Sequence, residues 1–308
     1  MKQLGISLIF FSISFSAFSQ CGEYVDIKFK CDSCRKNRDY LSASYYYEKC
    51  IKYKEFRRID YYYLSYCLFK SNKMNESYLY LKTAAKKGLH FESITRLLSD
   101  SLVMYINNNI PNNKLITLLK KNTTKYLHNL NLPLQQILVE KKIDDQKYRD
   151  PKLYQVPDKK RDSSLSKAGT RADLMNQNWL KNEIKNNGWP TLSKVGVEGD
   201  RTAWLIVQHA DNDTSFQKEC LSILLKLIPK NETSISNIAY LQDRILVNTN
   251  KEQIYGTQFV PILTEGKTTG LKLRPTINME CLNKRRNYVG LESIEEYLDF
   301  ARERYVVK

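Results

Sequence analysis

Long apolar runs, glycine, proline and histidine are all scarce in this chain of 308 residues. Past the first twenty residues, no apolar run approaches the roughly twenty residues that cross a bilayer, which excludes a multi-span membrane protein. With 11 Gly and 8 Pro, the chain is neither collagenous nor a low-complexity polymer. It contains no P-loop and no dinucleotide glycine fingerprint, so we expect no cofactor.

Histidine is too scarce for most metal sites. The chain has 3 His, and His209 is the only one after residue 128. The run Asp211-Asn212-Asp213 begins like a calcium-binding loop, but the glycine at its sixth place and the glutamate at its twelfth are missing. Metal ligation is therefore disfavoured.

The composition indicates a soluble, folded protein large enough for two domains. Hydrophobic residues make up 42% of the chain and aromatic residues 11%, which argues against wholesale disorder. The formal charge of +16 is uneven, because residues 1–170 hold 30 Lys+Arg against 16 Asp+Glu. This asymmetry is typical of two separate modules, or of a basic surface that meets an acidic partner.

The first nineteen residues have the pattern of a secretory signal peptide. Lys2 precedes an apolar run from Leu4 to Phe18, and the small residues Ala17 and Ser19 fit a cleavage site. We therefore expect an exported protein, periplasmic or secreted, with no membrane span after cleavage and no nucleic-acid partner. Lipid anchoring at Cys21 is disfavoured, because the residue before it, Gln20, is not small.

Cysteine is concentrated at the N-terminal end, where five of the seven cysteines lie within the first 67 residues. Cys31 and Cys34 have the spacing of a redox dithiol or of half a zinc site, but no second CxxC and no HxxxH follows. The pattern favours a structural disulfide that joins Cys31 or Cys34 to Cys50 or Cys67.

Residues 40–105 repeat with a period of 34. Small and large residues recur at matching places: Ala43, Tyr47 and Cys50 fall over Ser77, Leu81 and Ala84. This pattern resembles the tetratricopeptide repeat, with the signature Trp, Gly and Pro positions filled instead by Tyr61, Ser65 and Leu89. The resemblance implies antiparallel helix pairs across residues 20–130.

Tyrosine is abundant in these repeats, with eleven of the 21 tyrosines between Tyr40 and Tyr80. A run of three tyrosines cannot face one way on a helix, so some rings are expected at the surface among lysines. Such a groove would bind a protein, a peptide or an anionic polymer. The alternative is ordinary core and surface tyrosine.

Residues 131–308 predict a mostly α domain with a small β-hairpin. The expected helices cover 133–149, 172–186, 203–210 with Asp200 as its cap, 213–228, 233–247 and 293–305. Residues 253–262 and 271–277 are expected to form the hairpin around Gly266 and Gly270. The stretch from Asp150 to about Arg171 has no apolar periodicity and is predicted to be an exposed loop. The whole chain is thus expected to be mainly α.

The C-terminal region, from about Leu134, contains a series of specific short motifs. They are Asp145-Gln146 with Arg149, GWPT at 188–191, Val195-Gly196, AWLIVQHAD at 203–211, AYLQDR at 239–244, QIYGTQ at 253–258, and Arg286 with Gly290-Leu291. In these motifs the region resembles an uncharacterised bacterial family, the domain of unknown function 6624. The resemblance implies a domain that often follows a signal peptide or a repeat region, and it supplies no reaction.

His209 is the candidate acid/base residue, because it ends a strongly apolar helix among polar neighbours. A helix C-terminus stabilises a cationic imidazole, and Asp211 or Asp243 could orient the ring as a catalytic carboxylate. The alternative is a histidine that caps the last carbonyls. Arg244 is a candidate clamp for an anionic substrate, or else a structural ion pair.

Three functions remain open from the sequence. In the first, the repeats bind a partner, and a polar pocket in the C-terminal domain binds a small polar or anionic ligand. The second is a hydrolase or transferase that uses His209, and the third is a purely structural or interaction protein. The predicted ligand-binding residues are Trp189, Gln208, Arg244, Tyr255 and Gln258.

Overall fold

The computed structural model describes residues 23–53, 57–95, 102, 114–149 and 163–306. The chain separates into two compact units, which we call the N-terminal unit (Met1–Asn129) and the C-terminal unit (Leu130–Lys308). The expected signal peptide and most of the expected loop after Asp150 lie outside the described residues. Among the described helices, none is both long and apolar enough to traverse a bilayer.

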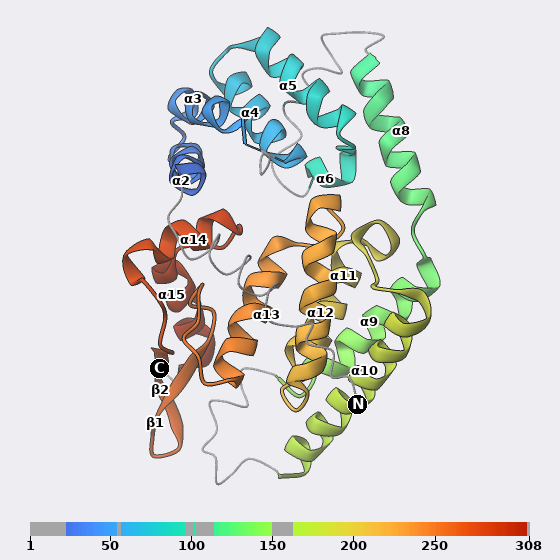
Figure 1. Cartoon of the computed structure of the whole chain (residues 1–308), viewed down its shortest axis with the longest axis vertical. Helices are drawn as coiled ribbons and strands as arrows, with labels where there is room; N and C mark the ends of the chain where they lie inside the picture. The colour runs from blue at the N-terminus through green and yellow to red at the C-terminus, as the bar shows by residue number, and fades with distance from the viewer. Residues whose placement is uncertain (1–22, 54–56, 96–101, 103–113, 150–162, 307–308) are drawn as a thin grey trace, which may run out of the picture. The chain divides into compact units, whose positions relative to one another are not determined.

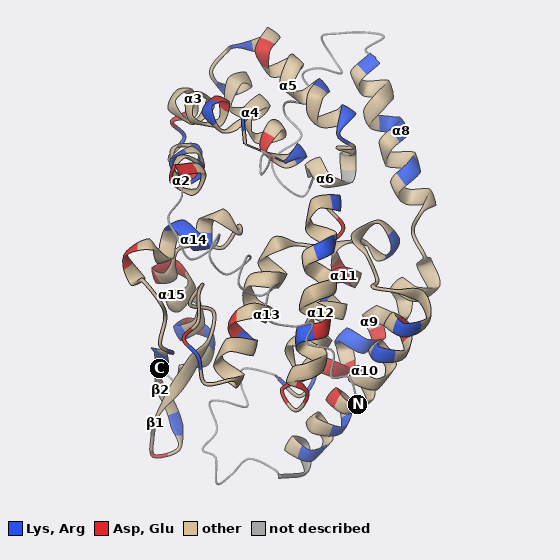
Figure 2. Cartoon of the chain, viewed as in Figure 1, with Lys and Arg blue, Asp and Glu red and all other residues tan. Residues whose placement is uncertain are grey.

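The N-terminal unit is built from paired helices, as expected (Figure 1). Helix α2 packs on α3, α3 on α4, α4 on α5, and both α5 and the short α6 on α8. The helices are α2 (Glu23–Lys36), α3 (Tyr40–Cys50), α4 (Arg58–Lys70), α5 (Met74–Lys86), α6 (Phe91–Thr95) and α8 (Lys114–His128). Helix α8 carries lysines along its length and no acidic residue (Figure 2).

Small residues set the closest approach of α4 and α5. The Ser65 hydroxyl donates to the Ser77 carbonyl at 2.7 Å, and the Ser77 hydroxyl donates to the Ser65 carbonyl at 2.8 Å. Two larger side chains could not be accommodated at this distance. Ser65 and Ser77 thus lie at a close helix contact, and Ser99, which falls over Ser65 in the period of 34, lies outside the described residues.

A buried ionic network joins α2, α3 and α4. The Lys28 ammonium binds the Asp32 carboxylate and lies 3.3 Å from the Asp60 carboxylate. The Tyr47 hydroxyl donates to Asp32, and the Arg35 guanidinium lies 3.5 Å from the same carboxylate. Each carboxylate therefore has a cation or a hydroxyl beside it, as burial of charge requires.

The C-terminal unit is arranged around α11, which contacts α9, α10, α12 and α13 (Figure 1). Its buried apolar core includes Leu138, Leu180, Val207, Leu224 and Leu241, one from each of these helices. The elements are α9 (Leu132–Gln146), α10 (Ser163–Asn187), α11 (Leu192–Gln208), α12 (Thr214–Leu227), η3 (Ile228–Lys230), α13 (Ile235–Asn248), β1 (Phe259–Thr264), β2 (Lys267–Leu273), η4 (Met279–Cys281), α14 (Leu282–Tyr288) and α15 (Ile294–Tyr305).

Helix α11 begins earlier than predicted, and Asp200 lies inside it rather than at its cap. The helix starts at Leu192 and passes a kink at Gly196, whose φ of 70° and ψ of −179° are accessible essentially to glycine alone. Asp200 is buried and accepts a hydrogen bond from Trp189 Nε1 at 3.2 Å. Asp200, which the sequence pattern predicted to be a helix cap, is thus a buried hydrogen-bond acceptor.

Other boundaries also differ from the prediction. Residues 163–171 form the first turns of α10, because the helix extends N-terminally beyond its apolar stripe. Strands β1 and β2 pair antiparallel and turn at Glu265 and Gly266, so the expected hairpin is present but its first strand starts at Phe259. The preceding residues 254–257 instead loop around the Asp243 carboxylate. The second strand covers Lys267–Leu273 rather than 271–277, because Gly270 pairs with Ile262 instead of forming part of the turn.

Candidate functional site: a histidine held by a buried carboxylate

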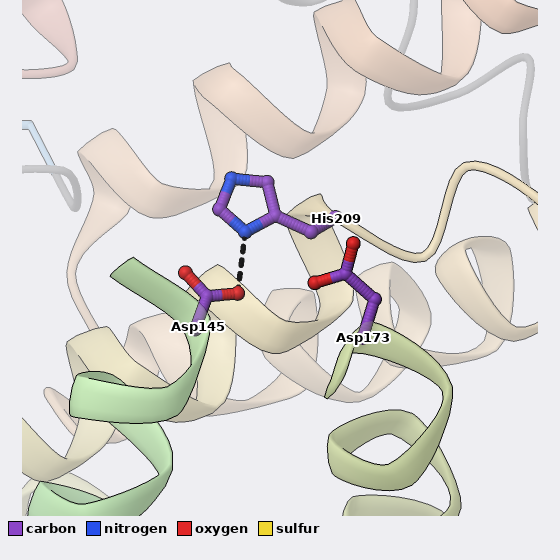
Figure 3. A group of neighbouring side chains, drawn as sticks. All are labelled: Asp145, Asp173 and His209. Carbon is purple, nitrogen blue, oxygen red and sulfur yellow. Dashed lines mark hydrogen bonds and ion pairs between the residues drawn. The ribbon is translucent and has the colours of Figure 1, made fainter. Parts of the chain in front are cut away.

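His209 immediately follows α11, as the sequence predicts. Its backbone N–H donates to the Leu205 carbonyl, so the residue closes the helix. Its imidazole Nδ1 lies 2.7 Å from Oδ1 of Asp145, a residue of the last turn of α9 (Figure 3). Because α9 packs on α11, side chains 64 positions apart meet.

The Asp145 carboxylate is almost completely buried and has several donors. Gln146 Nε2 donates to its second oxygen at 2.6 Å, and Arg149 Nη1 lies 3.4 Å from the oxygen that faces His209. Burial alone raises the pKa of this carboxyl. The hydrogen bond and charge of His209, with the Arg149 charge, outweigh that effect and hold the pKa below its ordinary value. Asp145 is therefore ionised at neutral pH.

Arg149 connects this pair to a second carboxylate, Asp173 of α10. Its Nη2 lies 2.8 Å from both oxygens of Asp173. Ligand atoms of Asp145, Asp173 and His209 all lie within 4.8 Å of one another (Figure 3). Three such groups could hold a metal ion, but the Arg149 guanidinium already supplies positive charge between the carboxylates. The donor set therefore fits an arginine-bridged acid pair better than a resident cation.

The arrangement leaves one imidazole nitrogen open. An ionised Asp145 accepts a hydrogen bond from the Nδ1–H group of the ring. In a neutral ring with its proton on Nδ1, the Nε2 lone pair is available to accept a proton. Nε2 points away from Asp145 in Figure 3, and no side chain in the described part of the chain bonds to it. The His209 side chain is 15% exposed, so the ring is largely covered but not sealed.

Asp211 and Arg244, two predicted site residues, form a half-exposed pair on the neighbouring turn. Arg244 Nε lies 3.5 Å from Asp211 Oδ1, and Asn248 Nδ2 donates to the same oxygen at 2.9 Å. The Asp211 side chain is 52% exposed. The carboxylate that holds His209 is thus Asp145, and Asp211 binds the C-terminal end of α13.

Asp243, the other predicted carboxylate, has no exposed surface. It accepts hydrogen bonds from the backbone N–H groups of Ile254, Tyr255 and Thr257, and from the Thr257 hydroxyl. Burial raises the pKa of Asp243, and these donors lower it in part. Its geometry is that of an anchor for the loop 254–257.

The remaining predicted ligand-binding residues are also mostly buried. Tyr255 belongs to the anchored loop, and Gln258 Nε2 donates to the Thr257 hydroxyl at 3.0 Å. Trp189 donates to Asp200, as described above. Gln208 precedes His209 and has a buried Oε1 with no hydrogen-bond partner among the described residues. Of this group, Gln208 is the one next to His209 in the sequence.

The group around His209 includes three residues that were absent from the predicted site: Asp145, Arg149 and Asp173. A signal for two of them was present, because Asp145-Gln146 with Arg149 is one of the family words. Nothing in the spacing indicates that this word meets the histidine. Asp173 has no such signal.

Comparison with known proteins identifies the family. The profile of a family of unknown function, DUF6624, matches residues 133–308, more than half of the chain. The matched region covers Asp145, Arg149, Asp173 and His209. No curated protein and no solved structure shows significant similarity to the chain. The chain belongs to the DUF6624 family.

Proposed function

We propose that the C-terminal unit is a hydrolase or group-transfer enzyme in which His209 is the general acid/base and Asp145 orients it. The observation that carries this proposal is the 2.7 Å bond from His209 Nδ1 to a buried, ionised carboxylate, with Nε2 left open. In this arrangement the carboxylate selects the tautomer and stabilises the imidazolium that forms during the reaction.

The reaction follows from the open nitrogen. Nε2 takes a proton from water or from a substrate hydroxyl while the oxygen attacks an electrophilic centre, and then returns the proton to the leaving group. Arg149 lies beside both Asp145 and Asp173, and its positive charge favours the ionised form of Asp145 beside the ring. Asp211 and Arg244 take no part in this scheme.

A panel of p-nitrophenyl esters, phosphoesters and glycosides tests the proposal. We expect turnover of at least one substrate class, with kcat/KM reduced by about 10²–10⁴ in His209→Gln and by a similar factor in Asp145→Asn. Glutamine can still donate to Asp145 but cannot exchange a proton near neutral pH, so the fold is retained. His128→Gln is the matched control, because His128 is exposed in the N-terminal unit.

A structural pair gives the opposite pattern. In that case no member of the panel is turned over, or turnover is unaffected by His209→Gln. In either case the free energy of unfolding should fall by about 3 kcal/mol or more in Asp145→Asn, because a buried ion pair loses one partner. Urea unfolding therefore shows that each variant is folded, and turnover with its dependence on His209 separates the two cases.

We also propose that the N-terminal unit binds an acidic peptide, as the repeat resemblance implies. The supporting observation is on α3, where Leu41 and Tyr45 are 58% and 54% exposed and the Lys49 ammonium lies 4.3 Å from the Tyr45 ring centroid. Fluorescent polyglutamate should bind to the protein and dissociate when salt is added. It should bind more weakly to Lys49→Gln than to Lys226→Gln, the control variant at a lysine of the C-terminal unit. Equal binding by both variants contradicts it.

A further inference from the structure

Two cysteines of the N-terminal unit face each other inside the contact of α2 and α3. The Sγ atoms of Cys31 and Cys50 lie 3.8 Å apart, and both side chains are 0% exposed. Among the cysteines of the described N-terminal residues, no other pair comes within hydrogen-bonding distance. Cys34 is half-buried, and Cys67 is buried on α4.

As free thiols, Cys31 and Cys50 contribute little to the stability of the helix pair. A thiol is a weak hydrogen-bond donor, and the S–H···S contact stabilises the helix pair only slightly. The ionic network of Lys28, Asp32 and Asp60 already holds α2 against α4. A covalent link between Cys31 and Cys50 would add what these contacts do not supply, a fixed connection from the middle of α2 to the end of α3.

We propose that Cys31 and Cys50 form a disulfide in the mature protein. The sulfurs must approach by about 1.8 Å to reach bonding distance, which rotation of the two side chains can provide in adjacent packed helices. The two thiols lose two protons and two electrons as the S–S bond forms. A low-molecular-weight or protein disulfide accepts them and is released as two thiols.

The surroundings determine when the bond forms. Hydrogen bonding to Cys50 and burial raise the pKa of the Cys31 thiol, so little thiolate is present in the folded, reduced unit. Oxidation therefore accompanies folding, and the finished bond is shielded from reductants. The export predicted from the Lys2 to Ser19 segment would place folding in an oxidising compartment.

Peptide mapping of the full chain tests the link. The chain is refolded in a mixture of reduced and oxidised glutathione, denatured with N-ethylmaleimide, and cleaved with trypsin without reduction. Cleavage beside Lys30, Arg35, Lys49 and Lys52 leaves Cys31 and Cys34 together in CDSCR and Cys50 in CIK. We expect a cross-linked pair of these peptides with one maleimide on Cys34.

Cysteine variants identify which sulfur of the CDSCR peptide forms the cross-link. The cross-link should persist in Cys34→Ala and disappear in Cys31→Ala and in Cys50→Ala. Recovery of both peptides only in alkylated form overturns the proposal, as does a cross-link that survives Cys31→Ala but is lost in Cys34→Ala.

Thermal unfolding provides a second readout that does not depend on single variants. Refolding with a strong reductant should lower the Tm of the N-terminal unit by about 10 °C, because the cross-link of a short loop no longer restricts the unfolded chain. The double variant Cys31→Ala/Cys50→Ala should show a smaller change in Tm on reduction than wild type does, because the disulfide of Cys281 is the one that the reductant still breaks among the described cysteines. A wild-type Tm that is the same with and without reductant would contradict the proposed disulfide.

Discussion

Three buried carboxylates of the C-terminal unit accept hydrogen bonds from very different groups, and their functions differ accordingly. Asp145 holds the imidazole of His209, Asp243 holds a backbone loop, and Asp200 holds Trp189 and the start of α13. Of these donors, only the imidazole of His209 is a group that can serve as a general acid/base. The chemistry of the partner, rather than burial, therefore distinguishes the candidate acid/base site.

Asp243→Asn tests the loop anchor. We expect it to lower the free energy of unfolding by about 3 kcal/mol, because one of the two accepting oxygens becomes an NH2 group, which is itself a donor and faces backbone N–H donors. Urea unfolding measures the change. Asp211→Asn is the control, since Asp211 is 52% exposed and its replacement should change stability by less than about 0.5 kcal/mol. Equal effects would show that Asp243 does not anchor the loop.

Asp200 should make stability depend on pH in the mildly acid range. Burial raises its pKa to about 6, although hydrogen bonds from Trp189 and Thr233 lower it in part. In the unfolded chain the carboxyl titrates near about 3.9, so the folded state binds the extra proton between about pH 4 and pH 6. The contribution of Asp200 to stability is therefore greatest below this window and is lost as pH rises through it.

Urea unfolding from about pH 4 to pH 7 measures this effect in wild type and in Asp200→Asn. The free energy of unfolding of wild type should fall relative to that of the variant by about 2–3 kcal/mol across the window. The difference between the curves isolates Asp200 from other titrating groups. Parallel curves would mean that the carboxyl titrates at its ordinary pH.

At the residue scale the sequence predicted His209 but not its partner. Its place at a helix C-terminus follows from the apolar stripe of AWLIVQHAD and the polar residues after it. The carboxylate that meets it depends on how α9 crosses α11, and local spacing carries no information about that contact. Asp211 and Asp243 were predicted because the first is close to His209 in sequence and the second lies in another family motif. Asp145 is far from His209 in sequence but contacts it in the structure.

At the scale of elements, close packing depends on glycine in α11. A Cβ added at Gly199 would lie 2.5 Å from Val195 Cβ and 3.3 Å from Leu138 Cδ1 of α9. The first distance is far below van der Waals contact, and the Gly196 kink brings Val195 to this place. Gly199 thus leaves room for Val195 of its own helix and lets Leu138 of α9 pack closely against α11.

Gly199→Ala should therefore destabilise the C-terminal unit by about 1–3 kcal/mol, as overpacking does. It should also weaken the His209–Asp145 contact, because α9 moves. Urea unfolding measures the first effect, and a perturbed NMR signal of the His209 ring measures the second. Val197→Ala, at a 42% exposed position of the same helix, is the control. An unchanged stability in Gly199→Ala would contradict the close contact.

Helices were more predictable than their ends. Apolar periodicity located α12, α13 and α15 to within a few residues, because each buries one face. The start of α11 was not predictable, since a φ of 70° at Gly196 is tolerated inside the helix only where its neighbours hold it. The first strand was placed too early, because Asp243 withdraws residues 254–257 from the extended form.

At the scale of the whole molecule, each unit has its own core. One cluster of buried apolar residues lies between Tyr62 and Leu119 and the other between Leu134 and Ile245. The family match begins at residue 133, close to the boundary between the units. A unit with its own core is expected to fold by itself.

A fragment of residues 130–308 should therefore unfold cooperatively without the N-terminal unit. We expect a single transition in circular dichroism and urea unfolding, and dispersed NMR signals. It should also retain the turnover and the His209 dependence of the full chain. A fragment that lacks a cooperative transition would mean that the C-terminal core is incomplete by itself.

The protonated nitrogen of the His209 ring tests the central claim most directly. Nitrogen-15 NMR of the full chain, recorded above the ordinary titration range of imidazole, distinguishes the two tautomers of the neutral ring. We expect the proton on Nδ1 and a bare Nε2 in wild type, with this preference lost in Asp145→Asn. A proton on Nε2 in wild type would leave the open nitrogen without a lone pair and would contradict His209 as a base.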